Sequence, residues 1–80
     1  MGLTDTERGI LDIEARLWLQ PGPKETAMLV ELGLSPNRYY QLLAKLLDDG
    51  RALRHDPVLI NRLRRRREAM RAARAARWVS

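Results

Sequence analysis

The residues of this chain with the clearest chemistry surround a short segment that predicts a helix end, a tight turn and a new helix start. Gly33 can adopt the left-handed conformation that ends a helix, Ser35 can cap the next helix, and Pro36 suits its first turn. Such a segment is typical of helix-turn-helix DNA-binding proteins. Asn and Gln side chains can bond bidentately to adenine, and Arg to guanine, in the major groove. The candidate base-reading residues, near the start of the helix predicted over 36–48, are Asn37, Arg38 and Gln41.

A second group of candidate ligand residues is basic. Residues 51–80 hold ten arginines and two acidic residues, a net charge of +8, whereas residues 1–50 hold five Lys and Arg against eight Asp and Glu, a net charge of −3. Nucleic acid suits such a segment better than an acidic membrane surface does, and a solvated, unfolded basic tail is an open alternative. The residues predicted to bind phosphate are Ser35, Tyr40, Lys45, Arg64, Arg65, Arg67, Arg71 and Arg74, with Arg66 and Arg77 in the same basic run.

No set of residues suited to catalysis can be assembled from this sequence. The chain has no cysteine, and its one histidine, His55, neighbours Asp56 rather than a second metal ligand. It also lacks a glycine-rich phosphate loop and a serine placed beside a base. The adjacent carboxylates Asp48 and Asp49 are better explained by a helix end and by solubility. We therefore predict no catalytic residues, no metal site, no cofactor and no enzymatic activity.

The size of the chain limits it to one domain. Eighty residues bury only about 60% of their unfolded surface, so the stability of such a domain is small. The absence of cysteine excludes disulfides and is compatible with a reducing cytosol. The charged first nineteen residues do not resemble a secretory signal, and no apolar stretch approaches the roughly 20 residues that span a bilayer. We expect a cytoplasmic protein, in the nucleoid if it binds DNA.

The hydrophobic pattern predicts an all-α protein. The capping box Thr4–Glu7 begins a first helix that is expected to run to about Leu19, and a second helix is expected from residue 23 or 24 to residue 32. With the third helix these form a helix-turn-helix core over 1–55, followed by an Arg-rich helix over 56–80 that packs partly on the core. The side chains predicted to face the core are Ile10, Leu11, Ile13, Leu17 and Trp18, then Ala27, Met28 and Leu32 with Leu29 or Val30, and then Tyr39, Leu42, Leu43, Leu46 and Leu47.

The segment between the third helix and the basic helix is predicted to be a connector. The third helix is expected to end at residue 48 or 49, because Gly50 follows. The connector covers 51–55, with Leu53 tucked into the core. The segment 47–53 resembles the entry to the β-wing of a winged helix. No second strand follows before Pro57, so we reject a wing.

The basic helix is expected to begin at a clear start signal and to lose order toward its end. Asp56 is a cap and Pro57 a first-turn proline, and the helix is predicted to run to about Arg77. Few large apolar residues follow Leu63, so the residues beyond about 68 are expected to fray, or to order when a partner binds. Trp78 is expected to be disordered.

Several short segments together carry a family resemblance. They are Leu3–Asp5, Ile10–Asp12 with Glu14, Gly22 with Lys24 and Glu25, Arg38–Leu43, Asp56–Pro57 and Leu63–Arg65. Over roughly residues 3–67 the chain resembles a small family of actinobacterial and mycobacteriophage proteins that is labelled only as a domain of unknown function and usually described as helix-turn-helix-like. Its most specific element is Arg38–Gln41. The resemblance implies such an origin and a DNA-binding role, but it brings no established ligand or catalytic residue.

These observations predict a small DNA-binding protein, either a transcriptional regulator or a nucleoid-associated protein. A monomer that binds one short site has little specificity, so we expect a homodimer or an array along double-stranded DNA. Asn, Arg and Gln also occur on any exposed helix face, which leaves a rival open: a phage or bacterial protein-interaction module that binds a host regulator or RNA polymerase. A second rival is RNA binding by the arginine helix alone.

Overall fold

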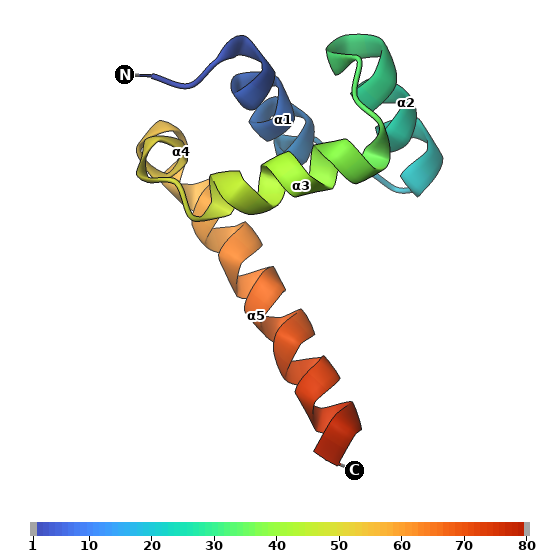
Figure 1. Ribbon diagram of the computed structural model, residues 1–80, viewed down its shortest axis with the longest axis vertical. Coiled ribbons are helices and arrows are strands. Elements are labelled where there is room, and N and C mark those ends of the chain that lie inside the picture. The colour runs from blue at the N-terminus through green and yellow to red at the C-terminus, as the bar shows by residue number, and fades with distance from the viewer. Residues whose placement is uncertain (1, 80) are drawn as a thin grey trace.

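The chain forms five α-helices and, over the residues that the structure describes, no strand. A computed structural model describes residues 2–79, and the side chains of residues 2–77, so the predicted disorder of the Trp78 side chain lies outside the described part. The helices are α1 (Asp5–Ala15), α2 (Pro21–Leu32), α3 (Pro36–Leu47), α4 (Gly50–His55) and α5 (Pro57–Val79). The first three helices pack against one another, and α5 runs from the end of α3 away from this bundle (Figure 1). The predicted all-α class is confirmed.

One cluster of buried apolar side chains joins all five helices. The buried side chains are Leu3, Ile10, Leu11, Ile13, Ala27, Met28, Tyr39, Leu43, Leu46, Leu47, Ala52, Leu59, Ile60 and Leu63. Complete burial of a side chain of this size contributes about 1.5–3 kcal/mol, so the cluster is the main source of stability. It includes residues of α5, and the first two turns of that helix therefore belong to the packed body.

Three helices, α1, α3 and α5, begin at the caps that the sequence indicates. At the start of α1, Thr4 Oγ1 accepts a hydrogen bond from the Glu7 amide at 3.1 Å, and Glu7 Oε1 accepts one from the Thr4 amide at 2.8 Å. At the start of α5, Asp56 Oδ1 accepts a hydrogen bond from the Leu59 amide at 3.1 Å. α5 then continues to Val79. No helix in the described residues is both long and apolar enough to cross a membrane.

α1 ends at Ala15, about four residues earlier than predicted. Arg16 adopts extended backbone angles, and its guanidinium bonds both carboxylate oxygens of Glu31 on α2 at 2.7 Å. The Trp18 indole Nε1 donates a hydrogen bond of 2.7 Å to the Ile13 carbonyl. These contacts turn the chain out of the helix, so Leu17 does not continue the apolar stripe and is 86% exposed. The predicted core position of Leu17 is therefore wrong.

α2 begins at Pro21, earlier than expected, and buries only one side. Proline in the first turn costs nothing, because those amides have no partner within the helix. Ala27 and Met28 are buried as predicted, whereas Leu29 and Val30 are both exposed. The expectation that one of these two faces the core is wrong, because the packing of α2 against α1 and α3 buries Ala27 and Met28 and leaves Leu29 and Val30 exposed.

The turn between α2 and α3 has the predicted geometry. Gly33 ends α2 with φ of 68°, in the left-handed region that favours glycine. The Gly33 amide bonds the Leu29 carbonyl at 2.9 Å, and the Leu34 amide bonds the Met28 carbonyl at 3.1 Å. These bonds satisfy carbonyls that a helix end would otherwise leave unpaired. Three residues therefore suffice to join the two helices.

A short helix, α4, replaces the predicted connector. Asp49 caps it by accepting a hydrogen bond from the Arg51 amide at 2.8 Å, and Gly50 is its first residue rather than only the end of α3. Ala52 is fully buried, and Leu53 is partly buried against the core as predicted. The sequence Asp-Gly resembles a simple turn, which is why α4 was not predicted.

Candidate nucleic-acid interface

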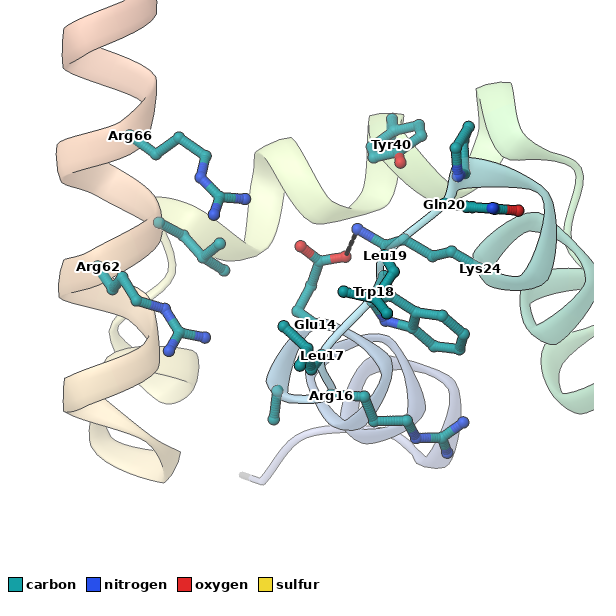
Figure 2. A pocket seen from close by; sticks show the side chains of 13 residues that line it. Glu14, Arg16, Leu17, Trp18, Leu19, Gln20, Lys24, Tyr40, Arg62 and Arg66 are labelled. Carbon is teal, nitrogen blue, oxygen red and sulfur yellow. Dashed lines mark ion pairs between the residues drawn. The ribbon is translucent and has the colours of Figure 1, made fainter.

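A groove lies between α5 on one side and, on the other, α3 and the loop that joins α1 to α2. It consists of two adjoining pockets, of about 510 Å³ and about 480 Å³, and the residues that line both are Glu14, Lys24, Tyr40, Leu63 and Arg66. Arg62 and Arg66 extend from α5 toward the loop, while Lys24 and Tyr40 reach in from α2 and α3 (Figure 2). We call this concave surface the arginine groove.

The groove exists because the inner side of α5 changes character along the helix. Leu59, Ile60 and Leu63 bury this side in the first two turns. Farther along, the same side carries Arg66, Arg67, Met70, Arg71 and Arg74, which line the second pocket. Guanidinium groups cannot be buried without partners. α5 therefore runs away from the bundle (Figure 1), and its arginines line the open groove.

Three arginines of the groove are available to a ligand. Arg62, Arg66 and Arg74 are exposed, and within the described part of the chain none of their side chains has a hydrogen bond or an ion pair. Arg71 bonds Glu68 at 3.3 Å, but both side chains of that pair are about two-thirds exposed. Exposed pairs of this kind contribute little and exchange readily. The inner side of α5 therefore presents cations that can bind an anion without breaking a buried contact.

The one carboxylate that lines the groove is neutralised within the protein. Glu14 is buried, and its Oε2 lies 2.7 Å from Lys24 Nζ and accepts a hydrogen bond of 2.5 Å from the Tyr39 hydroxyl. Lys24 Nζ also lies 5.6 Å from the centre of the Tyr40 ring. Glu14 therefore holds Lys24 at the groove wall and leaves no uncompensated negative charge there.

Two of the arginines predicted to bind phosphate instead join α5 to the end of α3. Arg64 Nε donates a hydrogen bond of 2.6 Å to the Leu47 carbonyl, and Arg67 bonds the Asp48 carboxylate at 3.0 and 3.2 Å. The Arg67 guanidinium holds the pKa of Asp48 below its ordinary value. Both arginines are only partly exposed. Their first role is to fix the angle at which α5 leaves α3.

The predicted base-reading residues lie at the exposed start of α3, but they do not all face the groove. Ser35 Oγ caps α3 by accepting a hydrogen bond from the Arg38 amide at 3.2 Å, and Asn37, Arg38 and Gln41 are exposed. Successive residues turn about 100° around a helix. Relative to Tyr40, which lines the groove, Asn37 and Gln41 lie about 60° and about 100° away, whereas Arg38 lies about 160° away on the far side.

Lys45 and Arg65 also lie outside the groove. Lys45 is about 140° around α3 from Tyr40, and Arg65 is exposed on the side of α5 that lines neither pocket of the groove. Conversely, Arg62 lines the groove but was not among the predicted phosphate ligands. Its spacing of four residues from Arg66, which places both on one side of a helix, was the available signal. Lys24 was missed because its position depends on packing against Glu14.

The fold and the groove define a small all-helical protein with a basic concave surface. Among the described residues, no group of three or more His, Cys, Asp or Glu could hold a metal ion. The chain belongs to a family of proteins of unknown function, DUF3263, whose family model matches residues 2–75. The predicted resemblance to a family labelled only as a domain of unknown function is thereby confirmed. No curated protein and no solved structure matches the chain.

Proposed function

We propose that this protein binds double-stranded DNA and acts as a transcriptional regulator or a nucleoid-associated protein rather than as an enzyme. In this proposal α2 and α3 form a helix-turn-helix, α3 enters the major groove, and α5 contacts phosphates. The observation that carries the proposal is that the side chains of Arg62, Arg66 and Arg74 have no hydrogen bond or ion pair within the described residues and line a groove that Tyr40 of α3 also lines. Surface cations of this kind supply the sequence-independent part of DNA affinity.

The start of α3 supports the base-reading part of the proposal. Asn37 and Gln41 are exposed amide side chains that lie within about 100° of Tyr40 around α3, and bidentate bonds to adenine require that chemistry. Ser35 satisfies the amide of Arg38, which leaves the Asn37 amide at the positive end of the helix for a phosphate oxygen. The N-terminal half of α3 therefore makes the contacts to DNA.

The far side of α3 supplies a second line of positive charge. Arg38 and Lys45 are exposed about 140–160° around the helix from the groove. A helix in the major groove has a phosphate backbone on each side. Lys45 then contacts the backbone opposite the one held by α5, and Arg38 reaches either a guanine or that backbone. One monomer reads few base pairs, so the proposal includes a homodimer or an array along DNA.

The test is a fluorescence-anisotropy titration of random-sequence duplex DNA at several salt concentrations, with the 80-residue chain. A truncation after Leu63 would also remove the two arginines that fix α5 to α3, so point substitutions are preferable. The groove variant is Arg62→Gln with Arg66→Gln. The control, with the same change in net charge, is Arg8→Gln with Arg54→Gln, and its melting temperature is measured as well, because the Arg8 guanidinium bonds the Leu3 carbonyl and Asp5.

The salt dependence of binding decides the test. Each phosphate contact contributes about 0.9 to the slope of log affinity against log salt concentration. We expect the groove variant to lose roughly 2 from the slope of the unsubstituted protein, and the control to lose nothing. Absence of binding at low salt, or equal losses in both variants, would contradict the proposal.

The exposed apolar side of α2 favours a second candidate function. Leu29 and Val30 are consecutive residues, and both side chains are exposed. Exposed apolar surface of this kind is typical of a site that contacts another protein. In this alternative the chain is an interaction module for a host regulator or RNA polymerase. An apolar interface depends weakly on salt, so a salt-insensitive interaction with such a partner would favour it.

RNA binding by α5 alone is recognised by affinity for RNA that survives alanine substitution of Asn37, Arg38 and Gln41.

A further inference from the structure

Two leucines on the loop between α1 and α2 are more exposed than any other large apolar side chain that the structure describes. Leu17 is 86% exposed and Leu19 is 88% exposed. Trp18, between them, is partly buried and donates its indole hydrogen bond to Ile13. In an extended segment alternate side chains point the same way. The loop therefore turns its tryptophan inward and both leucines outward.

The loop is held in place by contacts on both sides, so the exposure of the leucines is built into the fold. Before them, Arg16 bonds Glu31 and Asp12, and its guanidinium lies 6.0 Å from the centre of the Trp18 ring. After them, Pro21 begins α2. Exposing two leucine side chains to water is unfavourable relative to burying them. A ligand that covers them would recover this free energy.

The leucines line the same pocket as the free arginines. Leu17 and Leu19 form one lip of the 510 Å³ pocket, and Arg62 and Arg66 stand on the opposite wall (Figure 2). The carboxylate between them, Glu14, is neutralised by Lys24. A ligand for this surface must therefore present negative charge next to apolar surface. In duplex DNA, phosphates lie next to the faces of stacked bases.

We propose that Leu17 and Leu19 form an apolar wedge that enters the minor groove of DNA between base pairs and kinks the duplex. Arg62 and Arg66 hold the adjacent phosphates. This inference rests on the proposed DNA binding and adds a mode of binding to it. Leucine is one of the side chains that proteins insert between base steps, and such insertions bend DNA by about 20–90°. Unstacking the bases costs free energy, which burial of the two leucines and the phosphate contacts offset.

The wedge has a position compatible with α3 in the major groove. Tyr40 belongs to the first two turns of α3 and lines the same pocket as the two leucines. One phosphate backbone separates the minor groove of DNA from the major groove. A backbone that passes along the groove would contact the cations of α5 on one wall, with the leucine lip on the opposite wall and Tyr40 of α3 lining the same pocket.

The experiment measures DNA bending by resonance energy transfer between dyes at the two ends of a short random-sequence duplex, alongside anisotropy for affinity. The wedge variant is Leu17→Ala with Leu19→Ala. The control is Leu29→Ala, which changes an exposed leucine of α2 that lies outside the groove. Because all three side chains are exposed, the variants are expected to keep the melting temperature of the unsubstituted protein.

We expect the unsubstituted protein and Leu29→Ala to raise the transfer efficiency on binding. The wedge variant should bind roughly tenfold more weakly with an unchanged salt slope and leave the transfer efficiency at the value of free DNA. If the wedge variant bends DNA as the unsubstituted protein does, the wedge is wrong although DNA binding stands. Equal losses with Leu29→Ala would also overturn it. If no form binds duplex DNA, both proposals fail together.

Discussion

The hydroxyl of Tyr39 donates a hydrogen bond of 2.5 Å to the Glu14 carboxylate and lies 3.3 Å from the carbonyl oxygen of Ile10. Tyr39 belongs to α3 and Glu14 to α1, and Lys24 brings α2 to the same carboxylate. Burial, and then the hydrogen bond to Glu14, raise the pKa of Tyr39 well above its ordinary value. The hydroxyl therefore remains a donor at physiological pH, and three helices meet at one polar contact inside an apolar core.

Replacing Tyr39 by phenylalanine tests the importance of this contact. The substitution keeps the ring but removes the donor to a buried carboxylate, so the free energy of unfolding should fall by about 1–2 kcal/mol. For a chain of this size that lowers the melting temperature by several degrees, measurable by circular dichroism. The control is Tyr40→Phe, because the Tyr40 side chain is half exposed. Equal melting temperatures for the two variants would show that the buried hydroxyl contributes nothing.

Gly33 and Gly22 form a matched pair for testing the turn. Gly33 has φ of 68°, which a residue with a Cβ adopts only with strain, although nothing lies within 4 Å of the position that the Cβ would occupy. Gly33→Ala should therefore lower the free energy of unfolding by about 1 kcal/mol. Gly22 lies in the first turn of α2, also with open space around it, and Gly22→Ala should be neutral or slightly stabilising. Chemical denaturation measures both, and a loss at Gly22 as large as at Gly33 would refute the explanation.

The starts and ends of helices that depend on neighbouring residues could be predicted from the sequence. The Thr4–Glu7 box, the Gly33 turn and the Asp56 cap each involve residues within a few positions of one another. The end of α1 could not be predicted in this way. It depends on the pairing of Arg16 with Glu31, which is fifteen residues away and on another helix.

The sequence could not predict which arginines of α5 bond α3 and which face the groove, for a similar reason. The run from Arg64 to Arg67 offers four equivalent cations as a sequence. The direction from which α3 approaches α5 decides that Arg64 and Arg67 meet Leu47 and Asp48, whereas Arg66 faces the groove. Local sequence patterns identified a basic helix. Only tertiary packing distinguishes the arginines that bond α3 from those whose side chains can bind a ligand.

Acid should destabilise the protein, because four carboxyl groups are stabilised in their charged form. Hydrogen bonds, chiefly from the Thr4 amide and from Arg16, Arg67 and Arg51 respectively, lower the pKa values of Glu7, Glu31, Asp48 and Asp49. A group whose pKa is lower in the folded than in the unfolded chain stabilises the fold above its unfolded pKa, and that contribution is lost as pH falls through the folded pKa.

The predicted pH profile follows from these signs. The unfolded pKa values are about 3.9 for Asp and about 4.3 for Glu. The melting temperature should therefore be nearly constant from about pH 7 to about pH 5 and should fall progressively below about pH 4.5. The Asp48→Asn variant should be less stable than the unsubstituted protein at pH 7. Its melting temperature should also fall less steeply as the pH is lowered. A melting temperature that rises on acidification would contradict the assigned directions.

Substitutions along α5 should distinguish the arginines that join this helix to α3 from those that are proposed to bind DNA. Arg64 donates to the Leu47 carbonyl at the end of α3, so Arg64→Ala removes a partner from a carbonyl that the helix leaves unpaired. The free energy of unfolding should fall by about 1 kcal/mol. Arg74 has no hydrogen bond or ion pair within the described residues, so Arg74→Ala should leave stability unchanged and reduce the salt slope of DNA binding by about 1. Urea denaturation and anisotropy titration of both variants measure the two effects. If Arg74→Ala lowers stability and leaves the salt slope intact, the inner side of α5 has a structural role and the proposed phosphate contacts must lie elsewhere.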